Sequence, residues 1–252
     1  MLFRSLVSPD NSSDGAVKKR WKIICGERYL IKGSANQFYQ PEPFREVFAS
    51  KTAELLFKND FNDFAVKYDL IWEEDKKTGK KVYSSCKNFI CADTEYVPLT
   101  HFPEIESTAY NPEHIHVCRK IYGGYKHILD LILILDYIIL NEDRHFGNFG
   151  MIRNADTGEF IQPAPVFDMG SSLFYDSVII NAGTIRAKPF IKNFEEQIKL
   201  VNVRDYRENI LEVKKNTGEI FWDTFKNAFE DKERLSAILN TVNLQIDKLL
   251  VF

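Results

Sequence analysis

The chain has 252 residues, of which 44% are hydrophobic and 27% are charged, and its formal net charge is −3. These values are ordinary for a folded protein with one large domain or two lobes, and 20 Phe and 11 Tyr predict an aromatic-rich core. The small negative charge gives no general attraction to nucleic acid or to an anionic membrane. We therefore expect neither as a direct partner.

Targeting and membrane signals are weak in this sequence. The N-terminus lacks a basic start followed by a long apolar run, so we expect no signal peptide. The most apolar run, residues 128–140, is short and contains Asp130 and Asp136, which predicts a buried helix and not a membrane span. No C-x-x-C pair is present, so we predict reduced thiols in a cytoplasmic protein for Cys25, Cys86, Cys91 and Cys118.

The first 90 residues predict strands around one helix. After a polar, turn-rich opening, residues 21–33 predict two strands joined at Cys25-Gly26-Glu27. Residues 41–59 carry apolar side chains at helical spacing and predict a helix with Pro43 in its first turn. Two β-rich runs on either side of "DKKTGK" then predict a hairpin.

The pattern changes to helices from about residue 112. The apolar run after Gly123-Gly124 predicts a helix that ends near Asn141, and residues 150–168 predict a small hairpin around an Asp-Thr-Gly turn. About three helices are expected after residue 190. We therefore predict an α+β, two-lobed fold like that of protein kinases, with a β-rich N-lobe over residues 1–93 and a helical C-lobe over 94–252.

The stretch "LNEDRHFGNFG" carries the strongest signal for chemistry. Protein kinases have a catalytic loop in which an Asp is followed five residues later by an Asn that binds Mg²⁺, and Asp143 and Asn148 have this spacing. Alone, the pattern is loose and equally fits a helix-ending turn. A second metal-binding Asp is expected after a hairpin, and "VFDMGSS" supplies Asp168 there. Carboxylate and amide oxygens suit the hard cation Mg²⁺.

A phosphate-binding lysine is the next expected part. Lys32 ends a predicted strand, where most lysines are solvated, but kinases hold this lysine with a Glu of the following helix. Glu46 is our preferred partner. Glu42 is the alternative, although a carboxylate at a helix start is favoured by the helix dipole in any case.

The loop expected to cover the phosphates departs from the usual kinase pattern. Only "SSDGAVKKR", with Gly15 and the basic run 18–20, precedes the first strand, and no G-x-G-x-x-G or Walker A motif is present. Backbone N–H groups of a Ser/Gly loop can still bind phosphate, although a disordered terminal loop and a solvated charge run are the alternatives. We expect His145 to support the catalytic loop by hydrogen bonding and Asp156 to lie in a turn.

Taken together, five stretches resemble HipA-like serine/threonine kinases, the toxin kinases of bacterial toxin–antitoxin systems. They are "SPDNSSDGAVKKRW", "YLIKGS", "EPFREVFAS", "NEDRHFGNFG" and "PVFDMGSSL", and the resemblance covers most of residues 8–176. It is most specific in the last two. The Asp-Arg-His-x-x-Asn pattern is also similar to that of phosphatidylinositol kinases, which share the broader fold.

The resemblance implies a role for each matching position. Asp143 would be the catalytic Asp, Asn148 and Asp168 would hold Mg²⁺, and Lys32 would contact ATP phosphates. The connector that would bind adenine through its backbone consists of Lys87, Asn88, Phe89 and Ile90. The family also autophosphorylates a Ser in the loop before the ATP-binding strand, where Ser12 and Ser13 stand. A phosphate there adds roughly −1.5 to −2 charge where ATP phosphates must bind, which explains self-inhibition.

The resemblance also implies partners. Substrates in the family include aminoacyl-tRNA synthetases, and the usual partner is a small HipB-like helix-turn-helix antitoxin. Our leading hypothesis is therefore an ATP- and Mg²⁺-dependent serine/threonine protein kinase. A nucleotide-binding pseudokinase of the same fold and a kinase acting on a lipid or small molecule are the alternatives.

Overall fold

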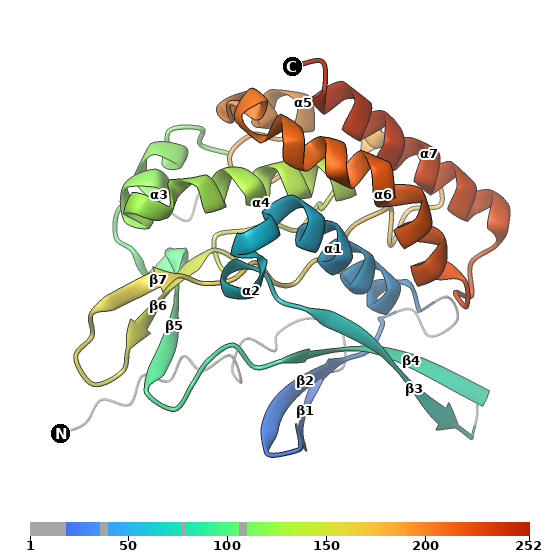
Figure 1. Cartoon of the computed structure of the whole chain (residues 1–252), viewed down its shortest axis with the longest axis horizontal. Helices are drawn as coiled ribbons and strands as arrows, with labels where there is room; N and C mark the ends of the chain where they lie inside the picture. The colour runs from blue at the N-terminus through green and yellow to red at the C-terminus, as the bar shows by residue number, and fades with distance from the viewer. Residues whose placement is uncertain (1–18, 36–39, 77–78, 106–109) are drawn as a thin grey trace.

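The computed structural model describes residues 19–35, 40–76, 79–105 and 110–252. A four-stranded antiparallel sheet in the order β1-β2-β4-β3 forms the lower part of Figure 1. Its strands are β1 (Lys19–Ile24), β2 (Glu27–Lys32), β3 (Tyr68–Asp75) and β4 (Gly79–Lys87). Both hairpins predicted from the sequence are present, with β1 paired to β2 and β3 to β4.

The tight turn between β1 and β2 explains why Cys25-Gly26 marks the hairpin. Ile24 is paired directly with Glu27, and both turn residues have a positive φ, 51° at Cys25 and 81° at Gly26. Two-residue hairpin turns with positive φ match the twist of the flanking strands. The turn therefore fixes the register that places Lys19 opposite Lys32 at the other end of the pair.

One long helix, α1 (Pro41–Phe57), lies between this sheet and the C-terminal helices (Figure 1). Phe44 and Phe48 are fully buried and pack their rings on Phe225, at centroid distances of 5.9 and 6.1 Å. A short 3-10 turn (Lys58–Asp60) and α2 (Phe61–Phe64) follow it. The buried residues of α1 therefore belong to the same hydrophobic core as the C-terminal helices. The predicted boundary between the lobes at residue 93 stays a prediction.

A second sheet, in the order β5-β6-β7, contains β5 (Thr94–Pro98), β6 (Gly150–Asn154) and β7 (Phe160–Pro163). The predicted hairpin over 150–168 corresponds to β6 and β7, whereas β5 was not predicted. A Cβ atom on Gly150 would lie 2.3 Å from the Tyr96 ring and 2.5 Å from the Val97 carbonyl oxygen. Glycine is therefore required where β6 begins and meets β5.

The remaining elements are helical. The apolar run predicted as a buried helix is α4 (Lys126–Ile139), which ends at Leu140 in the left-handed conformation. The other helices are α3 (His114–Tyr122), α5 (Phe194–Gln197), α6 (Arg207–Phe225) and α7 (Lys232–Leu249), and short 3-10 turns lie at Leu99–His101, Gly123–Tyr125, Ala182–Thr184, Ile198–Leu200 and Val203–Tyr206. Over the described residues, no helix is both long and apolar enough to cross a bilayer.

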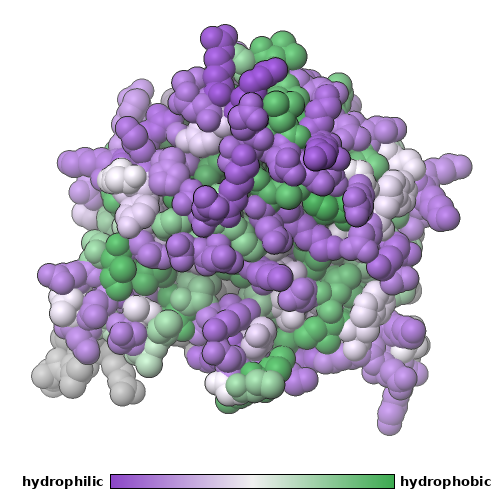
Figure 2. Space-filling model, in the orientation of Figure 1, coloured by the Kyte–Doolittle hydropathy of each residue, from purple (hydrophilic) through white to green (hydrophobic). Residues whose placement is uncertain are grey.

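A buried ionic link joins α1 to the C-terminal helices. Arg45 is fully buried, and its guanidinium donates to both oxygens of Glu230, at 2.9 and 3.0 Å, in the turn between α6 and α7. Arg234 also binds Glu230, at 3.0 Å, and donates to the carbonyl oxygens of Phe174 and Ser177. The outer surface over these helices is mainly hydrophilic on the face in Figure 2.

Candidate active site

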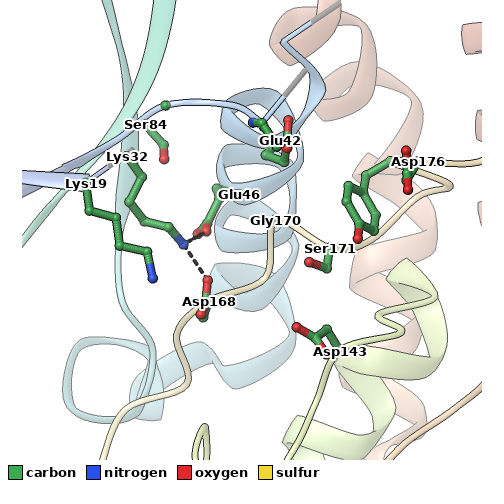
Figure 3. Close-up of a pocket in the computed structure, with 13 residues that line it drawn as sticks. Lys19, Lys32, Glu42, Glu46, Ser84, Asp143, Asp168, Gly170, Ser171 and Asp176 are labelled. Carbon is green, nitrogen blue, oxygen red and sulfur yellow. Dashed lines mark hydrogen bonds and ion pairs between the residues drawn. The ribbon is translucent and has the colours of Figure 1, made fainter. Parts of the chain in front are cut away.

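Lys32 lies at the centre of the candidate site, at the end of β2. Its side chain is buried, and the Nζ atom contacts the Glu46 carboxylate from α1 and lies 2.5 Å from Asp168 Oδ1 (Figure 3). Burial alone lowers a lysine pKa, but Asp168 and Glu46 outweigh it and raise the pKa of Lys32 above its usual range. Lys32 is therefore held in its positively charged form.

The two candidate glutamates of α1 have different tasks. Glu42 accepts hydrogen bonds from the Ser34 hydroxyl and, at 2.9 Å, from the backbone N–H of Ala35. It thus fixes the chain just after β2 and makes no ion pair with Lys32. Glu46 makes that pair, which resolves the two alternatives in favour of the preferred one.

Asp168 follows a short bridge that ties its segment to the chain between α2 and β3. Val166 donates to Phe64 and accepts from Val66, at 2.8 and 3.0 Å, and the Tyr68 hydroxyl accepts from the Asp168 N–H at 3.3 Å. Asp168 has a left-handed φ of 59°. Attraction by Lys32 is the main reason why the pKa of Asp168 is lowered. Its side chain is 40% exposed, so water screens part of that attraction.

The position two residues after Asp168, Gly170, has little room for a side chain. A Cβ atom there would lie 3.2 Å from Glu46 Oε1 and 3.3 Å from the Glu42 Cβ atom. The loop therefore packs directly on α1 at the level of Glu46. This close approach keeps Asp168 beside Lys32.

Asn148 and Asp168 form the candidate metal site. Asn148 is buried, and its Nδ2 atom lies 3.5 Å from Asp168 Oδ2. Among the described residues no group of three or more His, Cys, Asp or Glu side chains could hold a metal. Mg²⁺ is usually bound by one or two protein oxygens together with substrate phosphates. One carboxylate and one amide oxygen suit Mg²⁺ in the presence of a nucleotide. Here the Asn148 Oδ1 atom accepts from the His145 N–H at 3.4 Å and the Nδ2 atom faces Asp168, so the amide has to turn before its oxygen can bind the cation.

A buried hydrogen-bond network holds the loop that carries Asp143 and Asn148. Arg144 is fully buried and binds both oxygens of Asp136 at 2.8 and 3.0 Å, and its Nη1 donates to the Phe167 carbonyl at 2.9 Å. Asn141 donates to Asp136 Oδ1 at 2.9 Å and accepts from the Asp143 N–H at 3.3 Å. The loop is thus tied both to α4 and to the residue before Asp168.

This network was not predicted, although a signal for it exists. Asp136 lies within a run of buried aliphatic residues, and a fully buried Asp requires a charged partner. His145 supports the loop as expected: its Nδ1 atom accepts a hydrogen bond from the Gly147 N–H at 3.1 Å. The turn predicted at Asp156 is also present, because its N–H donates to Asn154 Oδ1 at 2.9 Å.

Asp143 opens toward the same cavity as Lys32 and Asp168. Its side chain is 51% exposed and lies 3.0 Å from the Nζ atom of Lys188. The cavity has a volume of about 340 Å³ and is lined by residues from β1, β2, α1, β4 and both loops. Figure 3 shows Lys32, Glu46 and Asp168 on one wall and Asp143, Ser171 and Asp176 on the other. Such a volume suits a small-molecule site.

For Lys19 the sequence left open a solvated charge run and a part in the phosphate-binding loop, and its side chain lines this cavity. It is paired with Lys32 across β1 and β2, and its charge also lowers the pKa of Asp168. Figure 3 shows both lysine side chains extending toward Asp168. The hairpin register, which sets this pairing, is the feature that could have identified Lys19.

The connector predicted to bind adenine, residues 87–90, is not part of the lining of this cavity. Lys87 ends β4 and forms an ion pair with Glu27. The Asn88 side chain binds the carbonyl and the N–H of Ile90, at 3.0 and 3.3 Å. Phe89 packs on Phe167 at a centroid distance of 5.5 Å. The remaining predicted positions, Ser12, Ser13 and Gly15, lie outside the described residues.

Sequence comparisons and structural comparisons give different results. No protein-family model matches the chain, and no curated protein sequence matches it either. Among solved structures, the proinflammatory kinase CtkA of Helicobacter pylori is 19% identical, with a TM-score of 0.65 over 92% of this chain and 93% of that one. HipA of Shewanella oneidensis MR-1, solved with HipB and operator DNA, is 11% identical, with a TM-score of 0.62 over 95% of this chain.

The chain has the fold of the HipA-like kinases. The predicted α+β, kinase-like fold is therefore confirmed. The match covers 93% of the CtkA chain and 65% of the HipA chain.

Proposed function

We propose that the chain is an ATP- and Mg²⁺-dependent serine/threonine protein kinase. The observation that carries the proposal is the arrangement around one cavity: Lys32 between Glu46 and Asp168, with Asp143 on the opposite wall. Phosphoryl transfer depends mainly on positioning and charge neutralisation, and each part of that requirement has a candidate residue here.

Lys32 would donate hydrogen bonds to the ATP phosphates while Glu46 holds its side chain. Lys19, from the neighbouring strand, would add a second positive charge at the same end of the cavity. Asp168 and Asn148 would hold Mg²⁺, which when bound neutralises charge on the phosphates. Asp168 therefore has to share its carboxylate between Lys32 and the metal.

Asp143 would act on the acceptor. Its carboxylate is 51% exposed, and the buried Asn141 fixes the backbone N–H beside it. It would accept a hydrogen bond from the substrate hydroxyl and take its proton as the new bond to phosphorus forms. Serine and threonine are the acceptors we propose.

The adenine ring would bind next to the connector Lys87–Asn88–Phe89–Ile90. The Asn88 amide already occupies both backbone groups of Ile90, so a base that uses these groups has to turn that side chain away. Phe89 and Phe167 provide an apolar surface beside it. The proposed backbone recognition of adenine thus predicts a rotamer change at Asn88.

Regulation and partners follow from the sequence resemblance. We propose autophosphorylation at Ser12 or Ser13, a protein substrate that in this family includes aminoacyl-tRNA synthetases, and a HipB-like helix-turn-helix antitoxin. The HipA neighbour was solved together with HipB, which supports the last of these. The four cysteines are free thiols, in keeping with the cytoplasmic location proposed from the sequence.

Incubation of the purified protein with Mg²⁺ and ATP tests the proposal. We expect a mass increase of one phosphoryl group, mapped to Ser12 or Ser13 by fragmentation, and transfer to casein as a general protein acceptor. Asp143→Ala should lower the transfer rate by roughly 10²- to 10⁴-fold while circular dichroism shows an intact fold. Lys199→Ala, an exposed change outside the cavity, serves as the control.

Other outcomes would support other functions. ATP binding without any phosphorylated product would favour the pseudokinase. Phosphorylation of inositol lipids in preference to casein would favour a lipid kinase of the same fold. Full activity of Asp143→Ala would contradict the proposed role of the catalytic loop.

A further inference from the structure

The catalytic loop contributes no cation of its own beside Asp143. Arg144 is the basic residue next to it, but its guanidinium points into the core toward Asp136 and the Phe167 carbonyl. His145 uses its Nδ1 atom as an acceptor for the Gly147 N–H. A phosphoryl group passing to a hydroxyl at Asp143 would therefore need positive charge from another part of the chain.

Lys188 supplies a cation at this point, from 45 residues further along the sequence. Its Nζ atom lies 3.0 Å from Asp143 Oδ1. The two side chains are 34% and 51% exposed, respectively. Such a pair contributes little to stability, because water screens it. Its position at the acceptor carboxylate therefore calls for a functional explanation.

The segment that carries Lys188 is held by a buried glutamine. Gln197, in α5, is 3% exposed, and its Nε2 atom donates to the Lys188 carbonyl at 2.9 Å. Its Oε1 atom accepts from the N–H groups of Phe190 and Ile191, at 3.0 and 3.1 Å. One side chain thus fixes the backbone on both sides of residue 189.

The same segment is packed directly on the catalytic loop. Phe190 is fully buried, and its ring lies at 5.7 and 6.3 Å from the rings of Phe146 and Phe149. Both of these residues belong to the loop that carries Asp143 and Asn148. The partly exposed Lys188 side chain therefore extends from a buried segment, and these contacts fix the position of that segment relative to Asp143.

We propose that Lys188 is a catalytic cation of phosphoryl transfer, an inference that rests on the proposed function. When the substrate hydroxyl binds Asp143, the ammonium group of Lys188 exchanges that carboxylate for an oxygen of the γ-phosphoryl group. The hydroxyl oxygen then forms a bond to phosphorus, and the bond between phosphorus and the β–γ bridging oxygen breaks with its electron pair staying on ADP. The hydroxyl proton goes to Asp143, and Lys188 remains protonated throughout.

The test compares Lys188→Ala and Lys188→Arg with the wild-type protein in single-turnover transfer from ATP, either to casein or within the chain. Loss of a preorganised group that stabilises transition-state charge lowers kcat by roughly 10²- to 10³-fold. We expect a fall in kcat of that size in Lys188→Ala. In Lys188→Arg, which keeps the charge, kcat should be at least tenfold higher than in Lys188→Ala. The ATP dissociation constant should change less than threefold, since ground-state binding relies on Lys32 and the metal.

The remaining outcomes separate this inference from the proposed function. A Lys188→Ala protein with wild-type kcat overturns the inference alone. So does a loss in kcat that Lys188→Arg does not relieve, because the charge is then not the active feature. Absence of transfer by the wild-type protein removes the kinase proposal together with the inference. Lys199→Ala, in the neighbouring 3-10 turn, controls for a general loss of positive charge.

Discussion

The two sides of the catalytic loop use the same type of ion pair in different surroundings. On the buried side, Arg144 and Asp136 are at most 1% exposed, bidentate, and connected to Asn141 and the Phe167 carbonyl. On the exposed side, Lys188 and Asp143 meet through a single contact in water. If Arg144 or Asp136 lost its partner, a charge would be left buried without compensation. Lys188 and Asp143 can each lose the other, because solvent reaches both side chains.

From this difference we infer a structural role for the buried side of the loop and, under the proposed function, a role in phosphoryl transfer for the exposed side. A buried and fully hydrogen-bonded pair fixes the backbone between α4 and the Asp168 loop, because breaking it leaves a charge without solvent. An exposed pair loses little when a substrate replaces one partner. We expect substitutions on the buried side to change stability first, and those on the exposed side to change activity alone.

The largest expected effect on stability is that of Arg144→Ala. It leaves Asp136 buried without its partner and removes the link to Phe167, so we expect a loss of about 3–5 kcal/mol in the free energy of unfolding. Urea unfolding followed by circular dichroism measures it. Arg153→Ala, which breaks the partly exposed pair with Glu95, is the matched control and should lose much less. Equal losses in the two variants would contradict the comparison.

A much smaller stability change is expected for Lys188→Ala. Because the Lys188–Asp143 pair is exposed, its removal should lower the free energy of unfolding by about 0–1 kcal/mol in the same urea experiment. The transfer rate of the same sample should fall strongly. A stability loss as large as that of Arg144→Ala would show that the exposed side is also structural.

The smallest expected effect is on the reactivity of the four cysteines. They too divide into buried and exposed side chains. Burial raises the pKa of the Cys86 and Cys118 thiols to about 12, whereas Cys25 and Cys91 are exposed. A thiol reagent at neutral pH should modify two cysteines in the native protein and all four only after unfolding. Rapid native modification of Cys118 would contradict the packing of α3.

The same thiols predict the direction of a pH effect. A thiol whose pKa is raised in the folded state binds its proton more tightly there than in the unfolded chain. Its contribution to stability is therefore complete below the unfolded value of about 8.5 and is lost as the pH rises toward 12. Replacement of Cys118 by Ser should make the urea midpoint less dependent on pH in this alkaline range.

Local patterns made much of the fold and part of the site predictable. The β1–β2 turn, the β3–β4 hairpin and α4 each depend on residues a few positions apart, and all are present. The pairing of Lys32 with Glu46 could be proposed because only 14 residues separate them and the strand-then-helix order is local. The same reasoning placed Asp143 and Asn148 in one loop.

Contacts between distant segments could not be predicted in the same way. Lys188 reaches Asp143 only because Gln197 and Phe190 fix its segment, and no spacing rule connects residues 143, 188 and 197. The two alternatives for Lys19, a solvated run and phosphate binding, stayed open because a single strand does not show which face meets the cavity. β5 was missed because its five residues acquire strand structure by pairing with β6, more than 50 residues later.

The buried link between Arg45 and Glu230 has a consequence for control of activity. In many kinases the helix that bears the lysine-binding glutamate swings between an active and an inactive position. Here α1 is fastened at its first turns to the junction of α6 and α7, and Arg234 extends the same link to Phe174 and Ser177 beyond Asp168. A swing of α1 would have to break this buried pair, which therefore opposes loss of the Lys32–Glu46 contact. Under the proposed function, we expect control of activity to depend on what enters the cavity and not on a movement of α1.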